Sequence, residues 1–256
     1  MKYIISASQD GLAGRIFCLI NSIYIAENNN LDIKLYWDRD VQNRFDLDYG
    51  DIFDKDFPRV SKEELKRALR KKEPIIHIDG RRVIPRKEII RILKSLRLKQ
   101  KFKKVQDSID YDYGFHIRRG DFVEIGNVKA SPLKLFDEIY SQNKSNGFLA
   151  SDDLSLKKRY KNLDTLDKKE PIYDLLALSK CKKIYCSYGS GFSELAEYLG
   201  ECNPERIVLV DKKELEKLKR KEEGKSYGFI GKIKSILYEN LVPIEKRFFR
   251  VRGRTP

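Results

Sequence analysis

Two adjacent arginines, Arg118 and Arg119, have the most easily stated chemistry in this sequence. They follow an apolar run that begins at Tyr113, so they stand at the end of a predicted buried strand, and Asp121 comes shortly after them. Paired guanidinium groups form bidentate, charge-assisted hydrogen bonds to phosphate oxygens, and a nearby carboxylate can hold one of them in position. The alternative is an ion-paired strand end without a ligand. We favour a phosphate site, because ligands of parallel sheets bind beyond the carboxyl ends of the strands.

Two glycines, Gly11 and Gly14, lie between a predicted strand and a predicted helix. Together with Leu12, Ala13 and Arg15 they form a segment in which the backbone can turn tightly and direct free N–H groups at a ligand. The glycine spacing differs from that of dinucleotide-binding and P-loop motifs, and no Lys-Ser or Lys-Thr pair follows. The segment is either a ligand-binding loop or a strand-to-helix turn that needs only compactness.

Two further strand ends carry small polar residues. Ser151, Asp152 and Asp153 follow an apolar strand, and their hydroxyl and carboxylate groups could contact a sugar or a base; either aspartate could equally cap the next helix. Later in the chain a Gly/Ser turn leads from a strand into a helix, where hydroxyl and N–H groups can accept a phosphate. The residues of this turn are Ser190, Gly191, Phe192 and Ser193.

The elements that position these residues alternate between strands and helices. Short apolar runs are followed by segments with apolar residues at helical spacing, in two rounds. This alternation predicts an α/β protein with two doubly wound, Rossmann-like domains built on parallel sheets. The predicted strands are 2–7, 31–37, 75–78, 113–117, 147–150, 183–187 and 206–210. The predicted helices are 16–25, 86–98, 172–179 and 192–199. Two more helices are predicted, one that begins with a capping box at Ser61 and Glu64 and one capped by Ser131 with Pro132 at its first position.

The predicted domain boundaries follow the composition. A polar, charged stretch near residue 102 separates the two rounds, and an aspartate-rich segment, 38–56, lacks either period and is predicted as an ordered loop with short turns. We therefore expect an N-terminal domain at 1–105 and a C-terminal domain at 106–226. Residues 227–256 are expected to form a helix and a basic tail that pack across the domains.

Composition excludes several classes of protein. The 256 residues are 41% hydrophobic, which is enough for a core and excludes disorder as the main state. No segment approaches the roughly 18–20 apolar residues of a membrane-spanning helix, and the N-terminus reads as a strand rather than a leader, so a cytoplasmic protein is expected. The four cysteines form no CxxC pair and only two histidines are present, which favours free thiols in a reducing compartment. The cysteines are Cys18, Cys181, Cys186 and Cys202.

Taken together, these motifs resemble the fucosyltransferase superfamily, which includes the α1,2-, α1,6- and nodulation fucosyltransferases. The segment from His116 to Asp121 reproduces the family's His-x-Arg-Arg-x-Asp signature, and the apolar strand that ends in Ser151 to Asp153 is similar to its second motif. Asp174 with the turn 190–193 resembles the third motif. The segment 11–15 resembles the family's N-terminal glycine loop, with Gly-Leu-Ala-Gly-Arg in place of Gly-Leu-Gly-Asn.

The resemblance implies a GT-B glycosyltransferase, with two facing Rossmann-like domains and no requirement for a metal or other cofactor. The N-terminal domain, 1–105, would lie on the acceptor side, and the C-terminal domain, 106–226, would bind the nucleotide sugar. Position by position, Arg118 would bind the diphosphate of the donor, Arg119 and Asp121 would shape the pocket, and His116 and Asp174 would contact the base, which is guanine in the family. The remaining donor contacts would come from Ser190, Gly191, Phe192 and Ser193, from Ser151 and Asp152, and from Gly11, Leu12, Ala13, Gly14 and Arg15. Fucose is the sugar expected. Another GDP- or UDP-linked sugar is the alternative, because the glycine loop and Gly191 differ from the family's usual sequence.

An arginine at the diphosphate suits transfer without a metal. A guanidinium that stabilises the charge developing on the leaving β-phosphate contributes roughly 3 kcal/mol or more. Inverting transfer to a saccharide hydroxyl also needs a carboxylate that accepts the hydroxyl proton, and Glu124 is the first candidate, with Asp121 and Asp10 as alternatives. The triplet that begins at Asp38 spells Asp-x-Asp, but in a charged loop we read it as solvated surface.

The net charge of +14, from 53 basic and 39 acidic residues, has a separate origin. From Lys212 onward the chain has 14 basic and 6 acidic residues, a net charge of +8. This tail is predicted to touch an anionic membrane surface at its last ten residues, while 227–242 has the spacing of a docked helix. The rival function is nucleic-acid binding, although no helix-turn-helix, zinc finger or RNP string is present.

Overall fold

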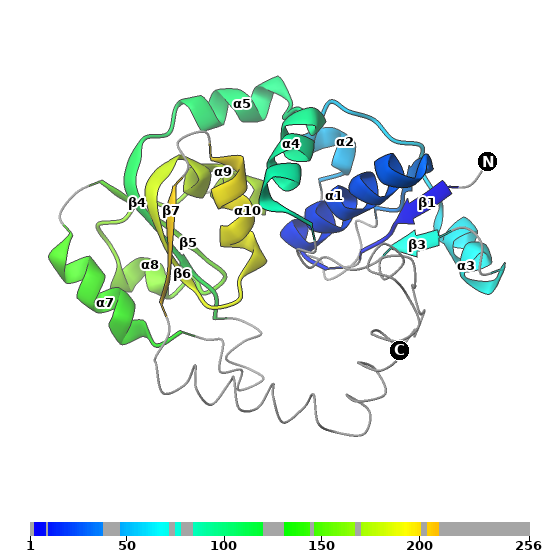
Figure 1. Ribbon diagram of the computed structural model, residues 1–256. Coiled ribbons are helices and arrows are strands. Elements are labelled where there is room, and N and C mark those ends of the chain that lie inside the picture. The colour runs from blue at the N-terminus through cyan, green and yellow to red at the C-terminus, as the bar shows by residue number, and fades with distance from the viewer. Residues whose placement is uncertain are drawn as a thin grey trace. The chain divides into compact units, whose positions relative to one another are not determined.

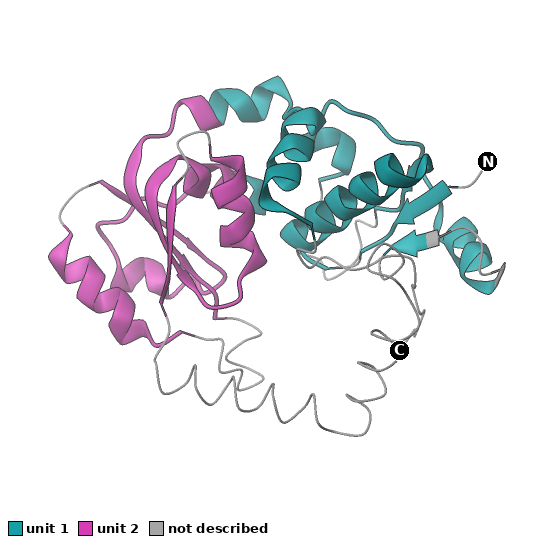
Figure 2. Cartoon of the chain, in the orientation of Figure 1, with its two compact units in different colours: residues 1–105, 169–172, 243–256 teal, residues 106–168, 173–242 magenta. Residues whose placement is uncertain are grey.

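The computed structural model describes residues 3–8, 10–37, 47–71, 75–77, 84–119, 131–143, 146–166, 170–200 and 204–209. The chain divides into two compact units (Figure 2). Among the described residues, the first unit holds those up to Val105 together with 170–172, and the second holds those from Gln106 to 166 and from Tyr173 onward. The predicted segment 227–256 and Cys202 lie outside the described residues.

The first unit is built on a parallel sheet of three strands in the order β2-β1-β3 (Figure 1). Its elements are β1 (Tyr3–Ser6), α1 (Leu12–Asn29), β2 (Asp32–Leu35), α2 (Tyr49–Ile52), α3 (Lys62–Lys71), β3 (Ile75–His77), α4 (Arg86–Leu96) and α5 (Gln100–Asp107), the last of which continues into the second unit.

Both faces of this sheet are covered, because successive side chains of β1 point in opposite directions. Ile4 packs with Ile25 and Ala26 of α1 on one face. Ile5 lies in a second cluster on the other face, which includes Leu65 and Ala68 of α3. A sheet with helices on both faces is the doubly wound arrangement expected from the sequence.

Helix α1 buries most of its surface, and its ends follow from the local sequence. Its first residue follows Gly11, which has an extended backbone (φ −62°, ψ 175°), and it ends at Asn30, whose left-handed conformation (φ 50°) lets its N–H donate to the Ala26 carbonyl. Asparagine tolerates this conformation better than most residues. The helix therefore begins at the carboxyl end of β1 and returns the chain to the start of β2.

The second unit is built on a parallel sheet of four strands in the order β5-β4-β6-β7. Its elements are β4 (Tyr111–Ile117), α7 (Leu133–Gln142), β5 (Gly147–Ser151), α8 (Leu156–Arg159), α9 (Pro171–Lys180), β6 (Cys181–Ser187), α10 (Gly191–Leu199) and β7 (Glu205–Leu209). Figure 1 shows α7 and α8 on one face of the sheet and α9 and α10 on the other.

Strand β4 lies inside this sheet and serves both faces. Phe115 is completely buried and contacts Phe136 of α7 and Tyr160 edge-on, with ring centroids 5.3 and 5.5 Å apart. On the opposite face, a Cβ atom added to Gly114 would lie 2.7 Å from Cys181 Sγ and 2.8 Å from Leu178 Cδ2. Glycine at this position lets α9 pack directly against the strand.

The structure confirms the predicted α/β class and its parallel sheets, but it contradicts the predicted cap of α7. The charged stretch near residue 102 lies at the boundary of the two units and forms helix α5, and the described part of 38–56 contains the four-residue helix α2, capped by Asp48. Ser131 does not cap α7, whose N-cap is Pro132 and which has no side-chain cap; the Ser131 hydroxyl is engaged elsewhere. The capping box at Ser61 and Glu64 is confirmed, with bonds of 2.7 and 3.2 Å.

The described cysteines are buried, as expected for free thiols. Cys18, Cys181 and Cys186 are buried free thiols. No helix in the described part of the chain is both long enough and apolar enough to cross a membrane.

Candidate active site

Most of the predicted site residues of the second unit lie at one edge of its sheet, where the parallel strands β4, β5 and β6 end. In the register of the sheet, His116 lies beside Ala150 and Cys186, and Ile117 lies beside Ser151. The chain of β4 then continues directly into Arg118 and Arg119. Three sequence motifs that are far apart along the chain are therefore neighbours at the carboxyl edge, as the resemblance implies.

The backbone of the two arginines is held by the neighbouring strand ends. The Arg118 N–H donates to Ser187 Oγ at the end of β6 (3.1 Å), and the Arg119 N–H donates to Asp152 Oδ1 beyond β5 (2.8 Å). Ser151 Oγ donates to the Ile117 carbonyl (2.6 Å). These three bonds fix the path of the chain where the two guanidinium groups leave the sheet.

Both arginine side chains are half-buried, and Arg119 has an acidic neighbour. Its Nε lies 3.7 Å from Asp153 Oδ2. Asp153 also accepts hydrogen bonds from the backbone N–H and the hydroxyl of Ser155, at 3.0 and 2.6 Å. The motif 151–153 thus supports the arginine segment and starts the next turn; the N-cap position of α8 itself belongs to Ser155.

His116 is buried in contact with the loop that precedes α10. Its Nδ1 lies 3.2 Å from Ser190 Oγ, and its ring lies 5.0 Å from that of Phe192, tilted by 32°. Burial, reinforced by the positive charge of Arg118, lowers the pKa of His116 to about 3. The imidazole is therefore neutral at physiological pH and is suited to hydrogen bonding rather than to ion pairing.

The turn before α10 has internal partners as well as exposed positions. Ser190 is the N-cap residue of α10 without a side-chain cap bond, and Ser193 Oγ donates to the Ser190 carbonyl (3.1 Å). Gly189 has φ 67°, a conformation that favours glycine. Gly191 and Phe192 are half-buried in the first turn, where the N–H groups of a helix are available to an anion.

Asp174 lies in the first turn of α9. Because α9 leads directly into the start of β6, its first turn lies toward the carboxyl edge of the sheet, on the side of the arginine segment. Burial raises the pKa of Asp174 to about 7, and the positive charge of Lys157 acts in the opposite direction. A carboxyl group with such a perturbed pKa near a ligand edge is a candidate functional group.

The glycine loop belongs to the first unit, at the start of α1. Arg15 is buried with 3% exposure, its Nε donates to the Asp10 carbonyl (2.8 Å), and its guanidinium lies 5.4 Å from the centre of the Trp37 ring. A Cβ atom on Gly14 would lie 2.5 Å from Asp10 Cβ, whereas one on Gly11 would meet no atom within 4 Å. Gly14 is needed for packing, but packing does not explain Gly11.

Several of the predicted residues cannot be compared with the structure. Gly120, Asp121 and Glu124 lie outside the described residues, as does the triplet that begins at Asp38. Leu12 and Ala13 are buried in α1, so of the loop residues these two can offer a ligand only their backbone.

The sequence analysis overlooked Ser187 and assigned Ser131 to the wrong partner. Ser131 Oγ bonds to the Leu209 carbonyl (2.5 Å) and accepts from the Tyr188 N–H (3.2 Å). Their positions at strand ends and next to a helix were visible in the sequence, but their partners depend on the strand order.

Solved structures with a similar fold are fucosyltransferases. The chain is similar to NodZ α1,6-fucosyltransferase soaked with GDP-fucose, with a TM-score of 0.56 and 11% identity over 79% of this chain and 96% of that chain. NodZ from Bradyrhizobium gives a TM-score of 0.56 at 11% identity, over 77% of this chain and 92% of that one. NodZ co-crystallised with GDP gives 0.53 at 11% identity, over 76% and 91%.

No protein-family model matches the sequence, and no curated protein matches it either. The likeness therefore rests on structure, and at this level of identity it shows the fold. Two separate parallel sheets, each with helices on both faces, are what the motifs led us to expect. The chain has the GT-B fold of the fucosyltransferases that its motifs resemble.

Proposed function

We propose that this protein is a glycosyltransferase that takes a sugar from a nucleotide-sugar donor and transfers it to a saccharide hydroxyl. One observation carries the proposal: Arg118 and Arg119 leave the sheet at its carboxyl edge, beside a neutral, buried His116, in a fold shared with a GDP-fucose-soaked fucosyltransferase. GDP-fucose is the donor that fits best. Another GDP-linked or a UDP-linked sugar is the alternative.

In this proposal the two arginines bind the donor diphosphate. When the bond between the sugar and the β-phosphate breaks, negative charge grows on the leaving oxygen, and a fixed guanidinium stabilises it by roughly 3 kcal/mol or more. Arg118 is the residue to which we assign this role. Since its backbone is tied to Ser187, the guanidinium starts from a fixed point and less conformational entropy is lost on binding.

The base of the nucleotide is proposed to lie near His116 and Asp174. Guanine presents N–H donors on its Watson–Crick edge, and an ionised aspartate accepts such donors with two oxygens. Binding would then lower the raised pKa of Asp174, since hydrogen bonds to the carboxylate favour its charged form. Ser190 and the first turn of α10 are proposed to complete the donor site.

Transfer is proposed to invert the sugar and to proceed without a metal ion. The acceptor hydroxyl loses its proton to a carboxylate as it attacks, and Glu124 remains the first candidate for this base, before Asp121 and Asp10. Contact of the basic C-terminal tail with an anionic membrane surface is proposed as well, because acceptors attached to lipid would be found there.

A thermal-shift comparison of GDP, UDP, dTDP and CMP tests the proposal directly. A ligand at about 100 times its Kd stabilises the folded protein by about 2.7 kcal/mol. For a chain of this size that corresponds to roughly 5–10 °C in Tm. We expect GDP to produce the largest shift. If none of the four nucleotides stabilises the protein, the proposal is wrong.

Substitution of Arg118 is the second test of the proposed function. Arg118→Ala is expected to abolish transfer and the shift caused by GDP while circular dichroism shows a folded protein. Arg67→Ala, which removes an exposed arginine from α3, is the matched control and should leave both unchanged. Transfer by Arg118→Ala at the wild-type rate would refute the assignment.

A further inference from the structure

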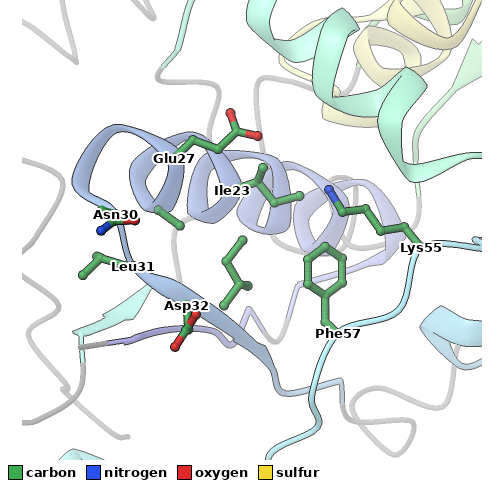
Figure 3. Close-up of a pocket in the computed structure, with 9 residues that line it drawn as sticks. Ile23, Glu27, Asn30, Leu31, Asp32, Lys55 and Phe57 are labelled. Atoms are coloured by element: carbon green, nitrogen blue, oxygen red, sulfur yellow. The ribbon is translucent and has the colours of Figure 1, made fainter. Parts of the chain in front are cut away.

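A cleft of about 320 Å³ opens in the first unit, away from the glycine loop. It lies between the last turns of α1, the start of β2 and a segment that follows α2 (Figure 3). Since α1 has 18 residues, its two ends are about 27 Å apart, so the cleft is a separate feature from Gly11 at the other end. Its lining residues are Ile23, Ala26, Glu27, Asn30, Leu31, Asp32, Ile33, Lys55 and Phe57.

The floor of the cleft is apolar. Ile23 and Ala26 come from α1, Leu31 and Ile33 from the chain that enters β2, and the ring of Phe57 forms one wall in Figure 3. The volume lies at the lower end of the range, about 300–1,000 Å³, found for small-molecule sites. Such a site usually combines an apolar surface with a few polar groups that fix the orientation of the ligand.

Four polar side chains supply those groups: Glu27, Asn30, Asp32 and Lys55. Glu27 is bound by the Arg91 guanidinium, with a second contact from Nη1 to Oε1 at 3.5 Å, and the same guanidinium also binds Glu88 through Nε at 2.8 Å. Asp32 is exposed and Lys55 is half-buried, with its ammonium 5.6 Å from the centre of the Phe57 ring. The lining therefore carries two carboxylates and one ammonium group.

The ammonium of Lys55 has no ion pair within 4 Å in the part of the chain that the structure describes. Figure 3 shows its side chain running past the Phe57 ring toward Ile23. A half-buried ammonium without a carboxylate partner retains hydrogen-bond donors for a ligand. Asn30 offers both a donor and an acceptor on the opposite side of the cleft.

We propose that this cleft binds a neutral saccharide. The lining offers carboxylate acceptors, an ammonium donor and an amide that is both, which matches a ligand whose hydroxyl groups both donate and accept. Its two carboxylates disfavour an anion, and its apolar floor with the Phe57 ring suits the C–H face of a sugar ring. This subsite goes beyond the proposed donor and acceptor chemistry and does not depend on it.

Saturation-transfer NMR with named probes tests the inference on the full chain. The neutral probes are lactose, cellobiose and maltose; lactobionate is the anionic analogue of lactose, and hexanoate represents an apolar anion. We expect at least one neutral disaccharide to receive saturation from the protein, and both anions to receive less. Absence of transfer to all three neutral disaccharides, or preferred binding of hexanoate, would overturn the proposal.

A double variant places the binding in the cleft. Asp32→Ala combined with Lys55→Met removes one acceptor and one donor at exposed or half-buried positions, so we expect affinity for the bound disaccharide to fall by about tenfold or more. Asp54→Ala with Lys104→Met, an exposed pair outside the cleft, is the matched control and should bind as the wild type does. Equal affinity in the cleft variant and the control would refute the location.

Arg118→Ala separates this proposal from the proposed transferase activity. The variant alters the second unit only, so disaccharide binding in the cleft should remain at the wild-type level while GDP no longer stabilises the protein. Loss of disaccharide binding in Arg118→Ala would show that the sugar occupies the transferase site instead, and the separate subsite would be rejected.

Discussion

His116 and Asp174 give the second unit two opposing dependences of stability on pH. Burial, with Arg118 acting in the same direction, lowers the pKa of His116 from 6.5 to about 3. Between these pH values the unfolded chain binds a proton that the folded chain excludes. The free energy of unfolding therefore falls by about 1.4 kcal/mol for each unit by which the pH drops, and by about 5 kcal/mol in total.

Asp174 acts in the opposite sense. Burial raises its pKa from 3.8 to about 7, against the influence of Lys157. Here the folded chain keeps a proton that the unfolded chain releases, so the stabilisation is complete below pH 3.8 and is lost as the pH rises toward 7. The loss is about 1.4 kcal/mol per pH unit. Between pH 3.8 and 6.5 the contributions of the two groups cancel.

Two substitutions expose these hidden contributions. Relative to the wild type, His116→Gln should gain about 1.4 kcal/mol of unfolding free energy per pH unit as the pH falls below 6.5. Asp174→Asn should gain a similar amount, about 1.4 kcal/mol per unit, as the pH rises from 3.8 to 7. The double variant should lose both dependences.

Urea denaturation at a series of pH values, followed by far-ultraviolet circular dichroism, measures these differences. Trp37 is the one tryptophan of the chain and lies in the first unit, so its fluorescence follows that unit separately and should show no effect of either substitution. Asp107→Asn, an exposed aspartate of the second unit, serves as the control. If the free energy of unfolding of each single variant, minus that of the wild type, does not change between pH 3.8 and 6.5, the reasoning is refuted.

Two glycines give contrasting predictions. Gly114→Ala places a methyl group 2.7 Å from Cys181 Sγ in the core, so we expect the free energy of unfolding to fall by about 1–3 kcal/mol in urea denaturation. An unchanged midpoint of the urea transition would show that α9 moves aside at no measurable cost. Gly11→Ser adds a side chain that meets no atom within 4 Å at an extended N-cap position, so stability should change by less than about 0.5 kcal/mol. If the Gly11 backbone approaches the donor, the same variant loses transferase activity, and full activity would remove Gly11 from the site.

Much of the fold could be predicted from the sequence, because strands and helices with a strong period depend on local patterning. The strand β4, the helix α10 and the capping box at Ser61 are examples. Helix α5 was missed because six of its eight residues are polar or charged, with Phe102 as a completely buried contact, so the apolar signal is weak. Its formation depends on packing that a local pattern does not report.

The partners of the polar residues could not be predicted, for a different reason. Ser131 precedes Pro132 at the start of a helix, a pattern typical of a cap, yet its hydroxyl joins the ends of β6 and β7. A hydroxyl group bonds to whichever acceptor the tertiary structure brings closest, and the order of the strands is not written in their local sequence. Ser187 escaped notice for the same reason, since its role depends on β6 lying beside β4.

The acidic motif at 151–153 is a further case in which the sequence did not predict the partners of polar residues, and it belongs to the proposed site. Its sequence fits a sugar contact and a helix cap equally well, and in the structure Asp152 instead accepts the N–H of Arg119 while Asp153 lies 3.7 Å from the Arg119 Nε. A carboxylate used in this way positions the arginine segment. Because both neighbouring strand ends hold the arginine segment, through Ser187 on one side and Asp152 on the other, the geometry of the proposed diphosphate site is a property of the whole sheet edge rather than of its signature motif.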